Sequence, residues 1–577
     1  MTQQELCRLN ATDASFLVQE RQGSHMHIGA VMVFEGPMPD IDDLKMHIQS
    51  RLHLVPRYRQ KLMWAPMEAG RPFWVDDPEF NLAYHVRDAA LPAPGNDDQL
   101  ERMCARIFSQ RLDRHKPLWE MWVVDGLAGG RFAVILKTHH SVIDGIAGVD
   151  VGTVLLGIEP TTKIDEPQPW RPRPLPTRGD LLEIGMREAA RAPFKFANTA
   201  MSLIKGDPEA REGLNGFVGG MTRAIGETLD AAPRTPMNTQ IGQHRRYKFV
   251  RNSLDDFKEI KTLLDTTLND VVLTVTSDAL GRWLRSRYYP TDGLKLRALV
   301  PVSTRPKKKR GVEASSGNEL LAMRGYLPVE EMDALERLNY IKNSMDGLKR
   351  SNQAVAADAL TAVQNFAPPT ILAQASRLNF STRLFNLLVT NVPGPQLPLY
   401  LLGRQMVDAF PIPFLAENHG LAVAVMSYNG RINFGILGDY DAIPDIQVIA
   451  DGISDSRDDL LDAASQVKSK ARELMRTSAD VTTLGHVAEG AAKSATKARA
   501  RRGANGGSKT AAKPRAAKPK AATPNGATVT PISAAASKSA GRKTAAKRPA
   551  ATKKAPAKRK PRSTNGASPT NGSAPTG

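Results

Sequence analysis

The chain has 577 residues, enough for two or more ordinary domains, and 41% of them are hydrophobic, so a large core is possible. Its net charge of +19 belongs to one end. Residues 491–577 contain 21 Lys and Arg and no Asp or Glu, which leaves 78 − 21 = 57 basic and 59 acidic residues, a net of −2, elsewhere. This distribution excludes a strongly basic globular body. Two cysteines, Cys7 and Cys104, give no disulfide framework and no zinc site, and they suit a reducing cytosol.

Residues 1–165 alternate between strand and helix patterns. In chain order we predict a strand at 27–34, a helix at 41–54 that stops near Pro56, a helix at 98–109, and strands at 119–125 and 132–138 joined by a Gly-rich hairpin turn. The first six residues form neither a basic leader nor an apolar stretch, so we expect no secretory signal. No apolar run approaches the ~20 residues that span a bilayer, so we expect membrane contact to be peripheral.

Residues 166–240 are rich in proline at both ends and predict an interdomain linker that carries helices, the first from Asp180 to Ile204 with a break at Pro193. Its apolar residues, among them Leu181, alternate with Arg and Lys and could lie on a membrane surface. Packing against the parent domain is the favoured alternative, because amphipathic helices usually face a core.

Residues 241–475 return to a mixed pattern. We predict helices at 268–284 and 332–352, strands at 296–302, 386–391 and 421–427, and a hairpin in which Asn429-Gly430 turns into a strand at 431–437. Residues 476–577 are expected to begin as a helical end. From residue 491 the chain is Ala, Lys, Pro, Ser, Thr and Gly, which cannot bury a core, so we expect a disordered basic tail.

The run His139-His140-Ser141-Val142-Ile143-Asp144-Gly145 directly follows the strand at 132–138. Strand side chains alternate between faces, so the two histidines point oppositely and only one enters a given cleft. A neutral imidazole is well matched to removing a proton near pH 7. Gly145 permits a sharp turn, and Asp144 could pair with an arginine, such as Arg305, or fix a histidine tautomer.

Two other interpretations of this run stay open on the residues alone. A buried histidine pair with a capping Asp is the commoner outcome for an isolated His-His. A metal site is less favoured, because adjacent strand residues do not easily face one ion and no further ligand cluster is near in sequence. We therefore expect no metal.

Further motifs accompany the histidine pair in order along the chain. They are Asp13 to Leu17, His25 to Gly29, Pro117-Leu118-Trp119, Asn269-Asp270, Leu299 to Arg305, Gly317-Asn318 and Asn391-Val392-Pro393-Gly394-Pro395. Together with HHxxxDG they resemble the bacterial wax ester synthase/acyl-CoA:diacylglycerol acyltransferase family, its actinobacterial members most, over about residues 8–475. Ser141 departs from the family's usual Ala, and Asn10-Ala11-Thr12 departs from its usual Ser-Pro-Leu.

The resemblance implies an α/β (α+β) fold of two chloramphenicol-acetyltransferase-like halves, residues 1–165 and 241–475, with the active site in a channel between them. It implies that His140 is the general base and that His139 and Asp144, which share the catalytic motif with Gly145, are mainly structural. Acyl-CoA is the implied co-substrate, with no other cofactor.

The remaining motif residues are expected to line or shape the channel, and each has a plainer alternative. Asn269, beside Asp270, could donate to the developing oxyanion or orient the acceptor, or could be an ordinary polar residue in a helix. Pro393 and Gly394, after Asn391, more plausibly form a rigid corner of the channel wall. Pro117 and Leu118 precede Trp119 in the same motif. Trp119 and Trp122 should face opposite sides of one strand, and we expect at least one of them to pack in the core.

The implied reaction is transfer of a fatty acyl group from acyl-CoA to 1,2-diacylglycerol. A long-chain alcohol acceptor, which gives a wax ester, is the first alternative, and acyl transfer to other alcohols or amide formation on carrier-bound substrates are others. The tail could bind anionic lipid, bind nucleic acid, or only solubilise the chain. A nucleic-acid-binding protein with an inactive body is the alternative from another class. We expect a cytoplasmic protein, peripheral on the inner membrane surface or on lipid droplets; oligomeric state is open.

Overall fold

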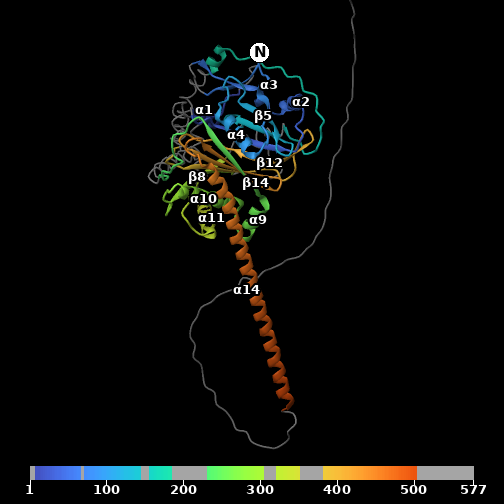
Figure 1. Cartoon of the computed structure of the whole chain (residues 1–577), viewed down its shortest axis with the longest axis vertical. Coiled ribbons are helices and arrows are strands. Elements are labelled where there is room, and N and C mark those ends of the chain that lie inside the picture. The colour runs from blue at the N-terminus through green and yellow to red at the C-terminus, as the bar shows by residue number, and fades with distance from the viewer. Residues whose placement is uncertain are drawn as a thin grey trace, which may run out of the picture. The chain divides into compact units, whose positions relative to one another are not determined.

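The computed structural model describes most of the chain, and the architecture below refers to those residues: 7–21, 23–66, 71–143, 152, 155–184, 231–303, 320–350 and 381–502. The chain divides into two units, residues 1–489 and 490–577. Helix α14 (Ile446–Arg502) begins in the first unit and runs on into the second. Everything else described here belongs to the first unit, whose strands form two six-stranded sheets and one two-stranded ribbon (Figure 1).

The first sheet has the strand order β11-β12-β1-β6-β5-β4. Its strands are β1 (His27–Phe34), β4 (Val86–Ala90), β5 (Trp119–Leu127), β6 (Arg131–His139), β11 (Tyr400–Leu401) and β12 (Arg404–Ile412). The elements around it are α1 (Ala11–Gln19), α2 (Ile41–Arg51), η1 (Leu52–Leu54), η2 (Pro56–Arg59), α3 (Leu82–His85), α4 (Asp97–Ser109), α5 (His140–Ile143) and a two-stranded ribbon of β2 (Gln60–Met63) and β3 (Phe73–Asp76).

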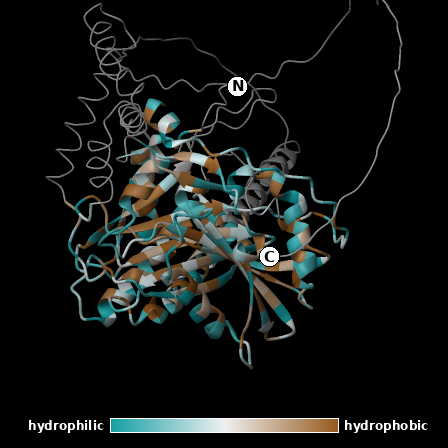
Figure 2. Cartoon of the chain, turned by 90° about the horizontal axis from the view of Figure 1, so that it is seen from above, coloured by the Kyte–Doolittle hydropathy of each residue, from teal (hydrophilic) through white to brown (hydrophobic). Residues whose placement is uncertain are grey.

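The second sheet has the strand order β7-β14-β13-β10-β8-β9. Its strands are β7 (Arg245–Ser253), β8 (Lys295–Ser303), β9 (Leu320–Pro328), β10 (Leu387–Pro393), β13 (Leu421–Tyr428) and β14 (Arg431–Asp439). Helices α9 (Leu254–Leu263), α10 (Leu268–Ser286), α11 (Ala334–Arg350) and the start of α14 bury their apolar residues against this sheet in one core. The strands of both sheets are largely hydrophobic (Figure 2), as expected for sheets enclosed by other elements.

The two sheets are joined by a strand that crosses between the halves. Although β12 comes from the C-terminal half of the chain, it pairs antiparallel with β1, with Gly29 opposite Ile412. It also passes over β7 and β14: the Tyr247 hydroxyl of β7 donates to the Pro411 carbonyl at 3.0 Å, and Gly435 of β14 lies against the same carbonyl. A third apolar core draws residues from both halves, including Ile135, Phe249 and Phe410. The two halves are therefore interleaved through backbone strand pairing and a shared core.

Ion pairs reinforce this junction on its polar side. The first turns of α4 present carboxylates to cations on β7: Lys248 binds Glu101 at 2.7 Å and Asp98 at 3.2 Å, and Arg251 pairs with Asp97. Acidic residues near a helix N-terminus also suit the helix dipole. The same carboxylates thus stabilise α4 and fix it against the C-terminal half.

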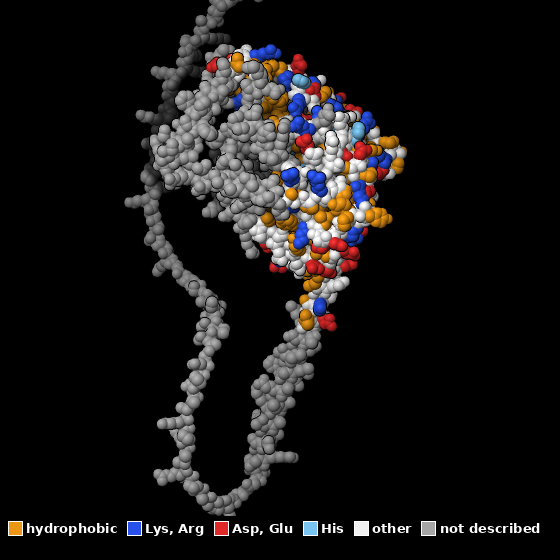
Figure 3. Space-filling view, turned by 90° about the vertical axis from the view of Figure 1, so that its left-hand side faces the viewer, with side chains coloured by type: hydrophobic (Ala, Val, Ile, Leu, Met, Phe, Trp, Pro, Cys, Tyr) orange, Lys and Arg blue, Asp and Glu red, His pale blue; other side chains and the backbone are white. Residues whose placement is uncertain are grey.

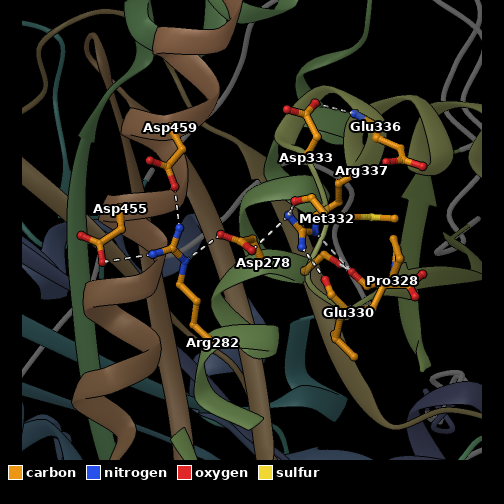
Figure 4. Close-up of polar contacts among 12 residues, drawn as sticks. Asp278, Arg282, Pro328, Glu330, Met332, Asp333, Glu336, Arg337, Asp455 and Asp459 are labelled. Atoms are coloured by element: carbon orange, nitrogen blue, oxygen red, sulfur yellow. Dashed lines mark hydrogen bonds and ion pairs between the residues drawn. The ribbon is translucent and has the colours of Figure 1, made fainter. Parts of the chain in front are cut away.

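A second polar junction holds α14 against α10 and the start of α11 (Figure 4). Arg282 donates to Asp278 at 2.8 Å and pairs with Asp455 and Asp459 on α14. On the other side of Asp278, the buried Arg337 lies 3.0 Å from its second oxygen. Since one carboxylate is shared by two guanidinium groups, the three helices are locked at one point.

Most elements predicted for the described residues are confirmed. The strand at 27–34 has the predicted bounds, the helix at 41–54 ends in the short 3-10 turn η1, and both hairpins form. The helix expected from 332 begins at Ala334. In the linker, residues 178–184 are helical and Leu181 is buried beside Phe73, which favours packing on the parent domain for that residue. The predictions for 185–230 and 503–577 lie outside the described residues.

Within the described part of the chain, no helix combines the length and the apolar character that crossing a bilayer requires.

The crossing of β12 over β14 leaves no room for a side chain. A Cβ atom on Gly435 would lie 1.7 Å from the Pro411 carbonyl oxygen, which is backbone and cannot move aside alone. We expect Gly435→Ala to lower the free energy of unfolding by about 1–3 kcal/mol, the usual cost of overpacking. Gly347→Ala on α11 is the matched control, because its Cβ meets nothing within 4 Å. Thermal unfolding should give a lower midpoint temperature for Gly435→Ala than for Gly347→Ala. Equal midpoint temperatures would contradict the close crossing of the two strands.

Candidate active site

The histidine pair lies where a strand turns into a helix: β6 ends at His139, and α5 begins at His140. Two carbonyls fix the backbone at this junction. The N–H of His139 donates to Leu118 at 3.0 Å, and the N–H of His140 donates to Met26 at 3.0 Å. The motif at 117–119 therefore holds the first histidine directly through its main chain. Asp144, Gly145 and Arg305 lie outside the described residues.

The ring of His140 is held between two aromatic side chains. Phe16 of α1 lies over it with ring centroids 4.0 Å apart, and Phe414 approaches at 5.7 Å with its ring nearly perpendicular. The side chain is partly exposed, but Nδ1 is buried and has no hydrogen-bond partner among the described residues. Burial lowers the pKa of His140 from its ordinary value of 6.5 to about 4, so the ring is neutral near pH 7.

His139 has a different environment from that of His140. The alternation expected for two strand residues does not apply, because β6 ends at His139 and His140 begins α5. The ring of His139 is buried, and Nδ1 accepts the backbone N–H of Ser141 at 3.1 Å and contacts the Ser141 hydroxyl at 2.7 Å. Ser141, which stands where the resemblance leads us to expect Ala, therefore binds this histidine through its hydroxyl and its backbone. Burial, with smaller effects of Arg114 and His140, lowers the pKa of His139 to about 3. His139 is therefore also neutral.

Sequence reasoning assigned no role to the polar groups that surround His139. The Glu20 carboxylate lies 3.7 Å from its Nε2 and is bound in turn by Arg114. The ring of His27 on β1 lies 5.9 Å away, edge-on, and the pKa of His27 is held well below 6.5, chiefly by burial. The one sequence signal for Glu20 is its spacing of four residues after Phe16, at the C-terminal cap of the same helix.

Lys137, two residues before His139, is fully buried on the same strand. Its ammonium group donates to the carbonyls of Ile107 and Gln110, at the C-terminal end of α4. Cations are favoured at that end of a helix. Burial lowers the pKa of Lys137 to about 8. Lys137 therefore links β6 to the C-terminal end of α4, two residues before the histidine pair begins.

The two tryptophans of β5 face opposite sides, as expected. Trp119 is buried, stacks on His85 with centroids 4.6 Å apart, and donates from Nε1 to the Tyr58 carbonyl at 2.9 Å. Trp122 is partly exposed and lies under the guanidinium group of Arg87. Trp119 is therefore a core residue. The motif at 117–119 reaches the site through the Leu118 carbonyl and not through the indole.

Asp270 occupies the first turn of α10. Its carboxylate accepts from the backbone and hydroxyl of Thr267, and Thr267 in turn accepts from the Asp270 N–H, a reciprocal cap. Asn269 is partly exposed in the same turn. Among the described contacts none joins Asn269 or Asp270 to either histidine. Oδ2 of Asp270 thus caps the helix, whereas Oδ1 is buried without a hydrogen-bond partner among the described residues.

Asn391, Pro393 and Gly394 lie at the end of β10, where the chain leaves the second sheet. A Cβ on Gly394 would lie 2.2 Å from the Ser427 carbonyl oxygen, so only glycine fits against β13. Gln396 then bonds to both Ser427 and the N–H of Gly430. This rigid corner directs the chain into β11 and β12, and Phe414 follows two residues after β12 ends.

Among the described residues, no three His, Cys, Asp or Glu side chains are grouped so that they could hold a metal ion. His25, His27 and His139 follow one another at ring separations of 5.5 and 5.9 Å. The chemistry open to this arrangement is proton transfer by a neutral imidazole in an apolar setting.

Two family models match the chain. Residues 9–272 match the wax ester synthase/diacylglycerol acyltransferase catalytic domain, and residues 316–460 match the WS/DGAT C-terminal domain. A protein of Mycobacterium tuberculosis named as a probable diacylglycerol O-acyltransferase is 32% identical over 452 residues, which cover 78% of this chain and 94% of the relative.

A solved structure supports the predicted fold. The wax ester synthase/diacylglycerol acyltransferase of Marinobacter aquaeolei VT8 is 25% identical, with a TM-score of 0.55, and the likeness covers 79% of this chain and 100% of that one. The predicted two-part, chloramphenicol-acetyltransferase-like α/β fold is thereby confirmed, while the channel between the halves stays a prediction.

Proposed function

Because the chain belongs to the wax ester synthase/diacylglycerol acyltransferase family, we propose that it transfers a fatty acyl group from acyl-CoA to 1,2-diacylglycerol, with His140 as the general base. The products are triacylglycerol and CoA. The neutral His140 ring supports this proposal most directly, because a general base must begin the reaction unprotonated.

The proposed reaction needs no covalent enzyme intermediate, since a thioester is already activated. The acceptor hydroxyl attacks the thioester carbonyl while His140 accepts its proton. The new C–O bond forms, the C–S bond breaks, and the proton passes to the departing thiolate to give CoA. Nδ1 of His140 is enclosed, so we assign the proton transfer to Nε2. The enzyme then contributes mainly by holding two substrates in line.

The acceptor is the part of the proposal most open to an alternative, because the family name covers wax ester synthesis too. We expect purified protein with labelled acyl-CoA to acylate diacylglycerol faster than a long-chain alcohol. Replacement of His140 by Ala should lower kcat by about 100-fold or more, as expected for loss of a general base. His115→Ala, an exposed histidine of the same half, is the matched control and should keep wild-type activity. Wild-type activity in His140→Ala would remove the base assignment.

The pH dependence gives an independent check on His140. An imidazole base works only when unprotonated, so activity is present above its pKa and is lost as the pH falls through it. Since burial lowers the pKa of His140 to about 4, we expect the acid limb of kcat/KM to lie well below 6.5. Initial rates at constant ionic strength measure this, with samples returned to neutral pH to exclude unfolding. An acid limb at 6.5 or above would contradict the enclosed base.

We further propose that the enzyme works in the cytoplasm at a lipid surface, the inner membrane face or a lipid droplet, because diacylglycerol resides in lipid. The described body carries both signs of charge intermixed (Figure 3), whereas residues 491–577 contain 21 cations and no acid. Basic residues near an anionic surface each contribute about 1 kcal/mol. The tail therefore supports attachment to anionic headgroups.

Deleting residues 491–577 should abolish sedimentation with vesicles that contain anionic lipid, and should spare acyl transfer to acceptor supplied in neutral detergent. Neutral phosphatidylcholine vesicles are the control and should bind both forms weakly. Raising the salt should weaken the tail-dependent binding, because it is electrostatic. If duplex DNA is bound more tightly than the anionic vesicles at the same salt, nucleic acid replaces lipid as the partner of the tail.

A further inference from the structure

The C-terminal end of helix α1 contacts both histidines of the pair. Phe16 lies on α1, and Glu20 is the residue that caps its C-terminus and donates its backbone N–H to the Phe16 carbonyl at 3.1 Å. The Phe16 ring lies over His140, with centroids 4.0 Å apart, and the Glu20 carboxylate lies 3.7 Å from Nε2 of His139. The end of α1 therefore packs against the strand-to-helix junction that carries both histidines.

Arg114 clamps this end of α1. Its Nε donates to Glu20 Oε2 at 2.8 Å, and its Nη2 donates to the same oxygen and, at 2.9 Å, to the Leu17 carbonyl. That carbonyl belongs to the last turn of α1, which has no partner within the helix. One guanidinium group thus closes the helix and holds the buried Glu20 side chain, which is only 4% exposed, in a single position.

The position of the proton on His139 follows from its partner. A backbone N–H can only donate, so Nδ1 of His139, which receives the Ser141 N–H at 3.1 Å, must carry a lone pair. The proton of the neutral ring is then on Nε2, the atom that faces Glu20. In this tautomer the imidazole caps the first turn of α5, the helix on which His140 is the first residue.

We propose that Glu20, clamped by Arg114, is a positioning residue for acyl transfer. Its negative charge favours the proton on Nε2 of His139, which leaves Nδ1 free to cap α5 and so fixes the direction of the His140 ring. The last turn of α1, which Glu20 caps, also carries Phe16 over that ring. This inference deepens the role proposed above for His140 and rests on it.

A general base depends on such positioning because its efficiency falls steeply with misplacement; an error near 1 Å can cost about 100-fold in rate. If the His139 proton moved to Nδ1, the Ser141 N–H would lose its acceptor and the start of α5 would be released. Nε2 of the buried His139 has no hydrogen-bond partner among the described residues, so the Glu20 charge 3.7 Å away acts on it electrostatically.

The test is Glu20→Gln, which keeps the shape of the side chain and removes its charge. We expect kcat to fall by about 10- to 100-fold with KM for both substrates nearly unchanged, because positioning and not binding is affected. Glu20→Asp should recover part of the loss, since it restores the charge at shorter reach. In ¹⁵N spectra of histidine-labelled protein, the His139 signals should move from the Nε2–H tautomer in the wild type toward Nδ1–H in Glu20→Gln.

Glu101→Gln is the matched control, because Glu101 is also a buried carboxylate paired with a cation, Lys248, but lies away from the histidine pair. We expect it to lower the unfolding temperature about as much as Glu20→Gln does and to leave kcat and the His139 tautomer unchanged. If Glu20→Gln behaves in the same way, Glu20 is only structural and the proposal is wrong.

The spectra separate failure of this inference from failure of the proposed function. They are recorded without substrate, so they report the influence of Glu20 on His139 even if the wild-type protein acylates no acceptor. A wild-type protein inactive on every acceptor, with the tautomer shift present, overturns the proposed reaction alone. An active wild-type protein whose tautomer and kcat do not respond to Glu20→Gln overturns the role of Glu20.

Discussion

The antiparallel pairing of β1 with two strands, one from each half of the chain, is the constraint on which the rest of the structure depends. On one side β1 pairs with β6, which places His27 opposite His139. On the other side it pairs with β12, which brings the segment after Ile412, and with it Phe414, to the ring of His140. A single strand thus fixes the distance between the histidine pair and the part of the C-terminal half that encloses it.

Burial has two opposed effects on the proposed chemistry. It keeps His140 and His139 neutral by lowering the pKa of each ring, which suits a group that must accept a proton. It also makes the protonated ring less stable, which weakens the base. The opposition is eased during reaction, because a proton on His140 would appear together with negative charge on the attacked thioester, and opposite charges attract strongly in a low-dielectric site.

Much of the fold could be predicted from local sequence, and much of the site could not. Apolar runs and turn residues identify β1 and the hairpin at Asn429-Gly430. The bounds of β1 are as predicted, and both hairpin strands begin at the predicted residues and end one or two residues later. The pairing of β1 with β12 joins residues nearly 400 positions apart and leaves no local pattern. The histidine run was recognisable because its residues are contiguous in the sequence. Glu20 and Phe414 were not recognisable, because they reach the run only through the tertiary fold.

The interleaved sheet has a consequence for the order in which the chain is made. Until β12 emerges from the ribosome, β1 has hydrogen-bonding groups along one side with no partner, and its sequence there is apolar. Roughly 370 residues separate Phe34 from Arg404, which at about 5–20 residues per second corresponds to roughly 20–75 seconds of synthesis. An unpaired apolar edge invites pairing with other chains. The N-terminal half is therefore a natural client for chaperones throughout that interval.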